Sequence, residues 1–253
     1  MTPLLKKRLS NLYASLYMDS KGLIGYTGFI GSILRLSDCI NFDCFFNKNN
    51  VNTITKYSFD LIICAAPTGN RIEVQKNSVN DLEMILFLID HLRKTEIKKF
   101  VLISTIDTLA RPNTRYGMNR KILECWIKNN LTNYCIIRLP TLIHPNIKKN
   151  ILYDLKHQQW LEKINLQAIN QYYDLTRLHK DIDYALQNNI KELNLFSEPI
   201  SNQEIKDKFF PRLPNTFNPS AGQKYNIYPQ QFTKAEIFAS MEKYFNEVPL
   251  HLW

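Results

Sequence analysis

The sequence predicts an α/β protein built on a doubly wound parallel sheet. Two observations carry this prediction. Short apolar runs, typical of buried strands, alternate with helical patterns over residues 22–140. In addition, four of the seven glycines lie within ten positions, where the first apolar run passes into the first helical pattern. A strand, a glycine-rich turn and a helix in this order open a Rossmann-like fold.

The apolar runs and helical patterns place the expected elements. The run FDLIICAAP at 59–67 is nearly continuous, as in a strand that is covered on both faces. The helical pattern at 78–94 has Ser78 as a suitable N-cap. Its apolar positions follow the helical period at Leu82, Ile85, Leu86, Ile89 and Leu92. The other strands are expected at 22–24, 41–46, 99–105 and 134–140, and the other helices at 30–36 and 116–129.

After Pro140 the sequence becomes mixed, aromatic and punctuated by prolines, with short helical patterns around 174–187, 202–208 and 233–245. We therefore expect a dinucleotide-binding domain at 20–140 and a smaller C-terminal substrate lobe at 141–253. Residues 1–19 are basic and place several leucines on one helical face, so we interpret them as an N-terminal extension or docking helix. A membrane-surface helix is the alternative for this segment.

Composition excludes several classes of protein. Apolar residues make up 45% and charged residues 22%, as in soluble globular proteins. The net charge of +9 suits a polyanionic partner, but the lysines are scattered and not interleaved with aromatics, so we expect no nucleic acid. No apolar run is long enough to span a membrane. The five cysteines form no CxxC pair and have no histidine at metal-ligand spacing, which predicts no metal and a reducing, cytoplasmic location.

The glycine cluster has the spacing Gly25-x-x-Gly28-x-x-Gly31. Bare glycines let the chain turn tightly and let a pyrophosphate approach the first amides of the helix, where the helix dipole is positive. The cluster therefore predicts a dinucleotide site, and a structural turn without a ligand is the alternative. The cofactor-binding residues expected in this turn are Gly25, Thr27, Gly28, Phe29, Ile30 and Gly31.

The end of the second strand selects between NAD and NADP in this fold. An acidic residue there binds the ribose 2′-hydroxyl, whereas a basic residue accommodates a 2′-phosphate. The strand ends in FNKNN at 46–50, without Asp or Glu. Asn47 and Lys48 therefore favour NADP slightly over NAD, although a solvated loop lysine gives the same pattern.

A second group of residues could perform acid–base chemistry. Ser104 and Thr105 end the fourth expected strand, and Tyr116 opens a helix that also carries Arg120 on the same face. A free phenol is a weak acid–base catalyst at pH 7, and a fixed cation nearby favours the phenolate. Thr105 could then hold a substrate oxygen while Tyr116 moves a proton and a nicotinamide moves hydride. The alternative is an exposed pair between Arg120 and Glu124.

Four segments together resemble a known family: GYTGFIG at 25–31, IICAAP at 62–67, ST at 104–105 and YGMNR at 116–120. They are similar to the extended short-chain dehydrogenase/reductases, and within them to the NAD-dependent epimerase/dehydratase group that acts on nucleotide sugars. Further segments at 138–150, 171–175 and 198–201 resemble bacterial members associated with surface-polysaccharide gene sets. The resemblance covers about residues 20 to 210.

The resemblance implies roles for particular residues. The catalytic set of a Ser or Thr, a Tyr and a Lys four positions later corresponds to Thr105, Tyr116 and Arg120, so an arginine stands where lysine is usual. Tyr116 and Arg120 would also contact the cofactor, and Arg120→Lys would raise the rate of a decayed site. The further cofactor contacts implied are Ala65, Ala66, Pro67, Leu139 and Pro140, and the implied substrate contacts are Lys149, Asn150 and Tyr172.

The expected function is that of an NAD(P)-dependent epimerase, dehydratase or reductase of a nucleotide-linked sugar, working in surface-polysaccharide biosynthesis. Dimers are common among similar proteins, so a homodimer is also implied. The arginine and the short gap between Thr105 and Tyr116 motivate an alternative, a catalytically impaired NAD(P)-binding regulatory or scaffold protein. A dehydratase needs an extra acidic residue beside the threonine, and Asp107, two positions after Thr105, is the candidate.

Overall fold

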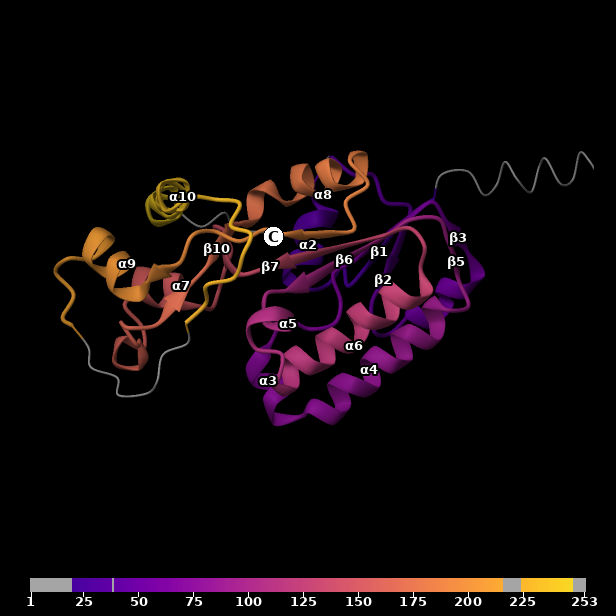
Figure 1. Cartoon of the computed structure of the whole chain (residues 1–253), viewed down its shortest axis with the longest axis horizontal. Helices are drawn as coiled ribbons and strands as arrows, with labels where there is room; N and C mark the ends of the chain where they lie inside the picture. The colour runs from indigo at the N-terminus through magenta and orange to yellow at the C-terminus, as the bar shows by residue number, and fades with distance from the viewer. Residues whose placement is uncertain (1–19, 38, 216–223, 248–253) are drawn as a thin grey trace, which may run out of the picture. The chain divides into compact units, whose positions relative to one another are not determined.

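The protein is described from a computed structural model, which covers residues 20–37, 39–215 and 224–247. Figure 1 shows the order of its elements along the chain. The expected extension at 1–19 lies outside the described residues. The strands are β1 (Lys21–Ile24), β2 (Cys44–Phe46), β3 (Ser58–Phe59), β4 (Leu61–Cys64), β5 (Glu96–Ile97), β6 (Phe100–Thr105), β7 (Tyr134–Leu139), β8 (Thr141–Ile143), β9 (Ile169–Asn170), β10 (Tyr172–Asp174), β11 (Glu192–Asn194) and β12 (Ile200–Ser201).

The α-helices alternate with these strands in the first half of the chain. They are α2 (Phe29–Arg35), α3 (Arg71–Lys76), α4 (Ser78–Leu92), α5 (Asp107–Ala110), α6 (Arg115–Asn130), α7 (Ile151–Lys156), α8 (Leu178–Gln187), α9 (Asn202–Phe209) and α10 (Lys234–Asn246). Three short 3₁₀ helices complete the described chain: η1 (Val51–Lys56), η2 (Leu161–Lys163) and η3 (Leu175–Arg177). No helix in these described ranges is long and apolar enough to cross a membrane.

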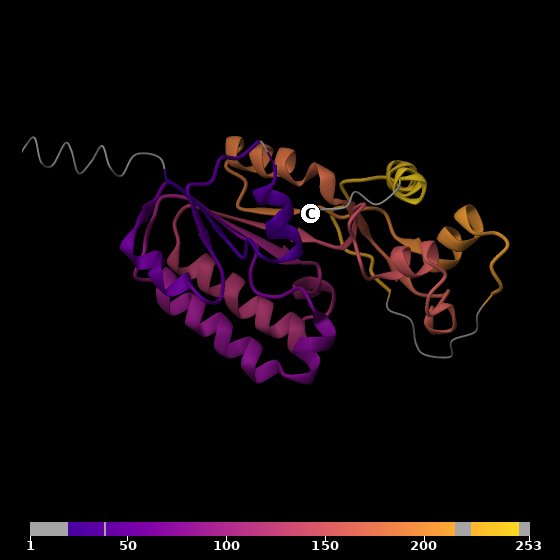
Figure 2. The ribbon, with the colours of Figure 1, turned by 180° about the vertical axis from the view of Figure 1, so that it is seen from behind.

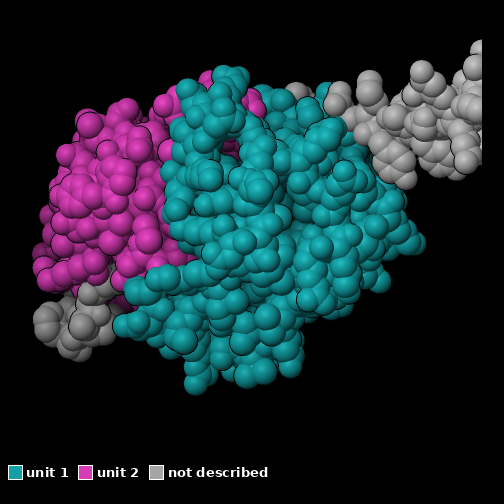
Figure 3. All heavy atoms as spheres, turned by 45° about the vertical axis from the view of Figure 1, so that its right-hand side comes forward, with its two compact units in different colours: residues 1–104, 112–137, 185–192 teal, residues 105–111, 138–184, 193–253 magenta. Residues whose placement is uncertain are grey.

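The chain divides into two compact units, which Figure 3 distinguishes by colour. Unit 1 contains the described residues of 1–104, 112–137 and 185–192, and unit 2 contains those of 105–111, 138–184 and 193–253. The sequence suggested one boundary at residue 140. The observed division is instead discontinuous, because residues 105–111 group with the second unit and residues 185–192 return to the first.

The central sheet has six strands in the order β11-β7-β6-β4-β1-β2. β1 pairs in parallel with both β2 and β4, and β4 pairs in parallel with β6. In chain order the strands of this sheet therefore run 2-1-3-4-5-6, and the direction of winding reverses at β1. This confirms the Rossmann-like doubly wound fold. Since η1 leads from β2 back to the other side of β1, β2 is the edge of the sheet. Ligands of such sheets bind at the carboxyl ends of the strands beside the reversal.

The helices of unit 1 lie on both faces of its strands. α4 and α6 pack against each other on one face, and α2 lies on the other face (Figures 1 and 2). The inward face of α4 consists of Asp81, Ile85, Leu88 and Leu92. The helical period was predicted correctly for Ile85 and Leu92, but Leu86 is 51% exposed. Because α4 is apolar on more than one side, the periodicity alone could not select its buried face.

The helix starts are set by polar caps. Ser78 is not the N-cap of α4, because the side chain of Asn77 accepts a hydrogen bond from the amide of Asn80 and Ser78 is the first helical residue. In unit 2, α9 and α10 each begin with a capping box, in which a hydroxyl and a glutamate three residues later satisfy each other's amides. The expected helices around 174–187, 202–208 and 233–245 correspond to η3 with α8, α9 and α10.

Candidate active site

Three of the predicted cofactor segments meet at the carboxyl edge of the sheet in unit 1. In the register of the strands, Ile24 lies opposite both Phe46 and Cys64. The amide of Gly25 donates to the carbonyl of Phe46 over 2.7 Å, and the amide of Ala65 donates to the carbonyl of Ile24 over 2.8 Å. The glycine turn, the end of β2 and the end of β4 therefore lie side by side.

The three glycines of the turn have different reasons to be glycine. Gly25 has a φ of +84°, and a Cβ there would lie 2.9 Å from the carbonyl carbon and oxygen of Ala65. A Cβ on Gly31 would lie 2.1 Å from the carbonyl oxygen of Gly25, so the helix can approach the turn only without a side chain. A Cβ on Gly28 would meet only that oxygen, at 3.3 Å. The fold therefore requires Gly25 and Gly31, but its own packing demands Gly28 far less.

Gly28 also begins α2. It is the N-cap, it lacks a side chain that could accept from the first amides, and the first turn contains no acidic residue. Both Gly28 and Phe29 are exposed. The positive end of the helix dipole is thus left without a carboxylate of its own, which is the arrangement that favours a bound anion.

Two cations lie near the end of β2. The side-chain amide of Asn47 donates to the hydroxyl of Tyr26 over 3.1 Å, and the guanidinium carbon of Arg35 lies 5.7 Å from the centre of the Tyr26 ring. Arg35 and Lys48 are both exposed, and neither forms an ion pair with the described residues. Sequence reasoning missed Arg35, because an arginine in the last turn of a short helix looks like any solvated arginine.

Tyr116 and Arg120 lie together at the start of α6, in unit 1. Thr114 caps this helix by accepting from the amide of Gly117 over 3.1 Å. Tyr116 is 9% exposed, and the guanidinium carbon of Arg120 lies 4.5 Å from the centre of its ring. The Tyr116 hydroxyl makes no hydrogen bond to any residue that the structure describes. It is therefore available to a bound molecule.

Arg120 is buried and paired with Asp81 of α4. Its two terminal nitrogens donate to the two carboxylate oxygens of Asp81, each over 2.8 Å, and one of them also donates to the carbonyl of Thr68 over 2.6 Å. Both side chains are 5% exposed. The alternative of an exposed pair with Glu124 is wrong: Glu124 is buried and accepts a hydrogen bond from Ser104. The Nε of Arg120 is buried and has no hydrogen-bond partner among the residues that the structure describes.

The remaining predicted residues belong to unit 2. The Thr105 hydroxyl accepts from the amide of Asp107 over 3.2 Å. Asp107 begins α5, is buried, and accepts from the hydroxyl of Tyr225 over 2.7 Å. Leu139 and Pro140 are buried at the end of β7.

The candidate substrate residues fall in three different settings. Lys149 is exposed. Asn150 caps α7, because its side-chain oxygen accepts from the amides of Leu152 and Tyr153. The Tyr172 side chain is fully buried, and burial raises the pKa of its hydroxyl, an effect that the nearby Asn170 side chain opposes. The structure gives a substrate contact by Asn150 or Tyr172 no support, and that role stays a prediction.

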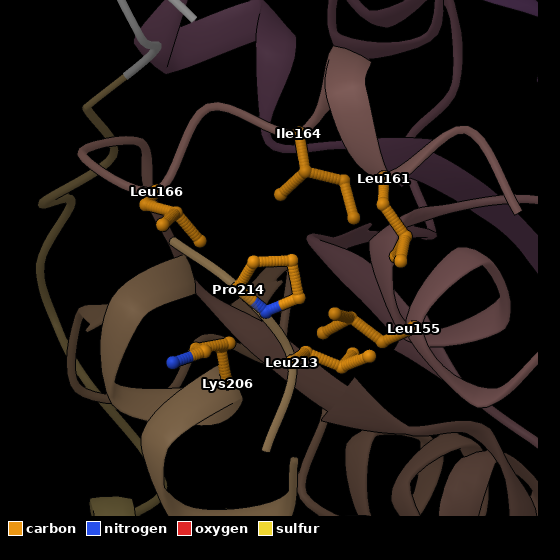
Figure 4. Close-up of a pocket in the computed structure, with 7 residues that line it drawn as sticks. All are labelled: Leu155, Leu161, Ile164, Leu166, Lys206, Leu213 and Pro214. Carbon is orange, nitrogen blue, oxygen red and sulfur yellow. The ribbon is translucent and has the colours of Figure 1, made fainter. Parts of the chain in front are cut away.

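Unit 2 also contains a small hollow lined by apolar side chains. Figure 4 shows these side chains gathered around Pro214, while the amine of Lys206 points away from them. The volume open to a water-sized molecule is about 10 Å³, which holds about one water. The hollow is too small for a nucleotide or a sugar. Its lining residues are Leu155, Leu161, Ile164, Leu166, Lys206, Leu213 and Pro214.

Comparison with solved structures identifies proteins that have a similar fold. One neighbour is dTDP-4-dehydrorhamnose reductase from Bacillus anthracis in complex with NADP, with a TM-score of 0.66 and 17% identity over 91% of this chain and 99% of that one. The chain has the fold of the extended short-chain dehydrogenase/reductases. The sequence matches no protein-family model and no curated protein.

Two further neighbours have the same fold. The Bordetella bronchiseptica enzyme WbmH in complex with NAD+ has a TM-score of 0.66 and 15% identity over 92% of this chain and 100% of that one. The UDP-glucose 4-epimerase of Thermotoga maritima with UDP-glucose has a TM-score of 0.61 and 13% identity over 86% of this chain and 91% of that one. The family resemblance of the sequence is thus confirmed at the level of the fold.

Proposed function

We propose that this protein binds NAD(P) and oxidises, reduces, epimerises or dehydrates a nucleotide-linked sugar. The observation that carries the proposal is the exposed Gly28, where an added Cβ would meet only the Gly25 carbonyl oxygen, at 3.3 Å, a much milder contact than at Gly25 or Gly31. The neighbours support it, because those described above are nucleotide-sugar enzymes or were solved with NADP, NAD+ or UDP-glucose.

The residues at the edge of unit 1 fit a dinucleotide. The turn from Gly25 to Gly31 would receive the pyrophosphate at the start of α2, with Ala65, Ala66 and Pro67 flanking it. Lys48, Asn47 and the additional Arg35 would bind a 2′-phosphate, so NADP is favoured over NAD. The unpartnered Nε of Arg120 is a buried donor that a bound acceptor would satisfy.

The proposed chemistry uses few groups of the protein. When bound, the cofactor donates or accepts hydride. The hydroxyl of Tyr116, which has no hydrogen-bond partner among the described residues, would move the proton of the reacting sugar hydroxyl. The role of Thr105, which belongs to unit 2, in holding a substrate oxygen stays the prediction made from the sequence. Arg120 would keep the Tyr116 ring in place through its contact with the ring face.

One observation favours a second candidate function. The charge of Arg120 is balanced by Asp81, so Arg120 does not give Tyr116 the unpaired positive charge that a family lysine would supply. A cofactor-binding protein with impaired catalysis would have such a site. Surface-polysaccharide biosynthesis and a homodimer rest on the resemblance of the sequence, and a cytoplasmic location rests on the cysteine pattern; all three stay predictions.

The two functions are separated by calorimetry and turnover. We expect NADPH to bind more tightly than NADH, and Tyr116→Phe to keep this binding while losing a factor of about 10² to 10⁴ in turnover of the best nucleotide sugar in a panel. Binding without any Tyr116-dependent turnover would favour the impaired protein. If neither coenzyme produces heat at millimolar concentration, both functions fail.

A further inference from the structure

We infer that Asp81 and Arg120 act as one positioning unit that holds both the loop after β4 and the ring of Tyr116. Asp81 does not touch the reacting groups itself. It holds Arg120 in place, and Arg120 holds the loop after β4 and the ring of Tyr116. The consequence for cofactor binding and turnover rests on the proposed function, whereas the positioning itself belongs to the fold of unit 1.

The hydrogen bonds of the pair join three separate segments. Arg120 belongs to α6, Asp81 to α4, and the carbonyl of Thr68 to the loop between β4 and α3. The carboxylate of Asp81 is further held by the side-chain amide of Asn119 over 2.8 Å, which also donates to the carbonyl of Ser78. The loop at 65–70 contains Ala65, Ala66 and Pro67, which are proposed cofactor contacts. Its position therefore determines whether these residues can contact a bound dinucleotide.

Only a guanidinium can make this set of contacts. Its planar fork gives parallel hydrogen bonds to both oxygens of a carboxylate and leaves further N–H groups for a third acceptor. The compact ammonium of a lysine has a shorter reach and no such fork. The arginine is therefore matched to Asp81, and it is not simply a weakened form of the usual lysine. Lysine at position 120 would leave a buried carboxylate poorly satisfied and the Thr68 carbonyl unbound.

This reasoning reverses the expectation for Arg120→Lys. If the site were decayed, lysine would restore its rate. If Arg120 and Asp81 form one unit, Arg120→Lys instead releases the loop. We expect amide exchange at 65–70 to become at least about tenfold faster and the dissociation constant for NADPH to rise at least about tenfold, with exchange in β7 unchanged.

The pairing itself is tested by a double-mutant cycle on thermal stability. Asp81→Asn and Arg120→Gln each leave one buried charge without its partner, so each should lower Tm by on the order of 10 °C. The double variant removes both charges and should lose much less than the sum of the two. Lys128→Gln is the matched control, because Lys128 lies on the same helix as Arg120 and forms a partly exposed ion pair with Glu192 of β11. It should leave Tm nearly unchanged.

The outcomes distinguish the inference from the function. Unchanged exchange at 65–70 in Arg120→Lys, or strictly additive Tm losses, would overturn the positioning unit even if the protein binds NADPH. If the wild-type protein binds no nicotinamide coenzyme, the proposed function fails, but the exchange and the cycle on the free protein still decide the inference. A pair that is merely structural would lower Tm and leave both the exchange at 65–70 and the NADPH dissociation constant unchanged at 20 °C.

Discussion

At the scale of single residues, the three glycines of the turn serve different purposes: two are required by the fold, and the third is explained by a ligand. Gly25 adopts a left-handed φ, and Gly31 brings α2 against the turn. Gly28 has a φ of −78° and a ψ of 169°, a backbone conformation that other residues adopt without strain. Its identity is therefore explained best by a molecule that approaches the turn from outside.

Two alanine substitutions should therefore affect different properties, one mainly the stability of the fold and the other mainly coenzyme binding. Gly31→Ala forces a methyl group toward the Gly25 carbonyl, so it should cost about 1–3 kcal/mol of unfolding free energy or more. Gly28→Ala should cost less than about 1 kcal/mol, yet it should weaken coenzyme binding at least about tenfold, because the methyl group occupies the approach of the phosphates. Thermal melts and calorimetry measure the two effects. Equal affinity of Gly28→Ala and wild type would remove the reason for assigning the turn to a ligand.

The sequence placed Tyr116 and Arg120 together, because residues four apart share a helix face whatever the fold. It did not identify Asp81, which lies 39 positions before Arg120 on another helix. An aspartate in the first turn of a helix is usual at the solvated surface, so nothing in the pattern marks this one as buried. Local sequence patterns cannot predict contacts between residues that are distant along the chain, such as this one.

At the scale of elements, the expected strands and helices of the first 140 residues are present, because runs of apolar residues and turn residues are local signals. The sheet order required more. The classical dinucleotide order places a third strand beyond the second, and here the η1 segment follows β2 instead. Whether a short polar segment becomes an edge strand or a 3₁₀ turn depends on pairing across the sheet, which the sequence does not display.

In unit 2, the register of two strands places a histidine, His144, in a partly buried position near carboxylates. β8 pairs in parallel with β10, and Ile143 lies opposite Asp174. His144 follows directly and is half-buried. Burial lowers the pKa of His144 below its ordinary value of 6.5, and the nearby Asp174 and Glu247 oppose this effect without cancelling it.

The lowered pKa gives stability a defined pH dependence. The folded protein binds the proton of His144 less readily than the unfolded chain, so the contribution to stability is present above pH 6.5 and is lost as the pH falls below it. We expect the Tm to decrease from pH 7.5 to 5.5, and to decrease less in His144→Asn, whose side-chain oxygen can still accept from the amide of Asn146. Parallel curves for the two proteins would show that His144 does not contribute.

At the scale of the whole molecule, the fold is shared with neighbours at 13–17% identity. Such a fold tolerates almost complete replacement of its side chains because the alternation of buried strands and covering helices is preserved. The two discontinuous units were not predicted from the sequence. They are defined by contacts between segments that are distant along the chain, and a change of composition at Pro140 cannot reveal the return of residues 185–192.

The reactivity of the five cysteines can report on how the whole central sheet opens. Cys39 and Cys125 are exposed, whereas Cys64 in β4 and Cys135 in β7 are buried. Burial raises the pKa of the Cys64 thiol to about 12 and that of Cys135 to about 11, so neither forms the reactive thiolate at neutral pH. Labelling of these two thiols therefore requires the sheet to open.

We expect a thiol reagent to modify Cys39 and Cys125 in the native protein, and Cys44 more slowly because burial raises its pKa. Cys64 and Cys135 should react at least about 10³-fold more slowly than the exposed thiols, in line with ordinary folding stability. Because both strands belong to one sheet, their labelling should accelerate over the same range of denaturant. Mass spectrometry of the labelled wild-type protein measures these rates directly, thiol by thiol. If Cys135 reacted well before Cys64, the sheet would open strand by strand from the β7 side, and a single free energy of unfolding would not describe it.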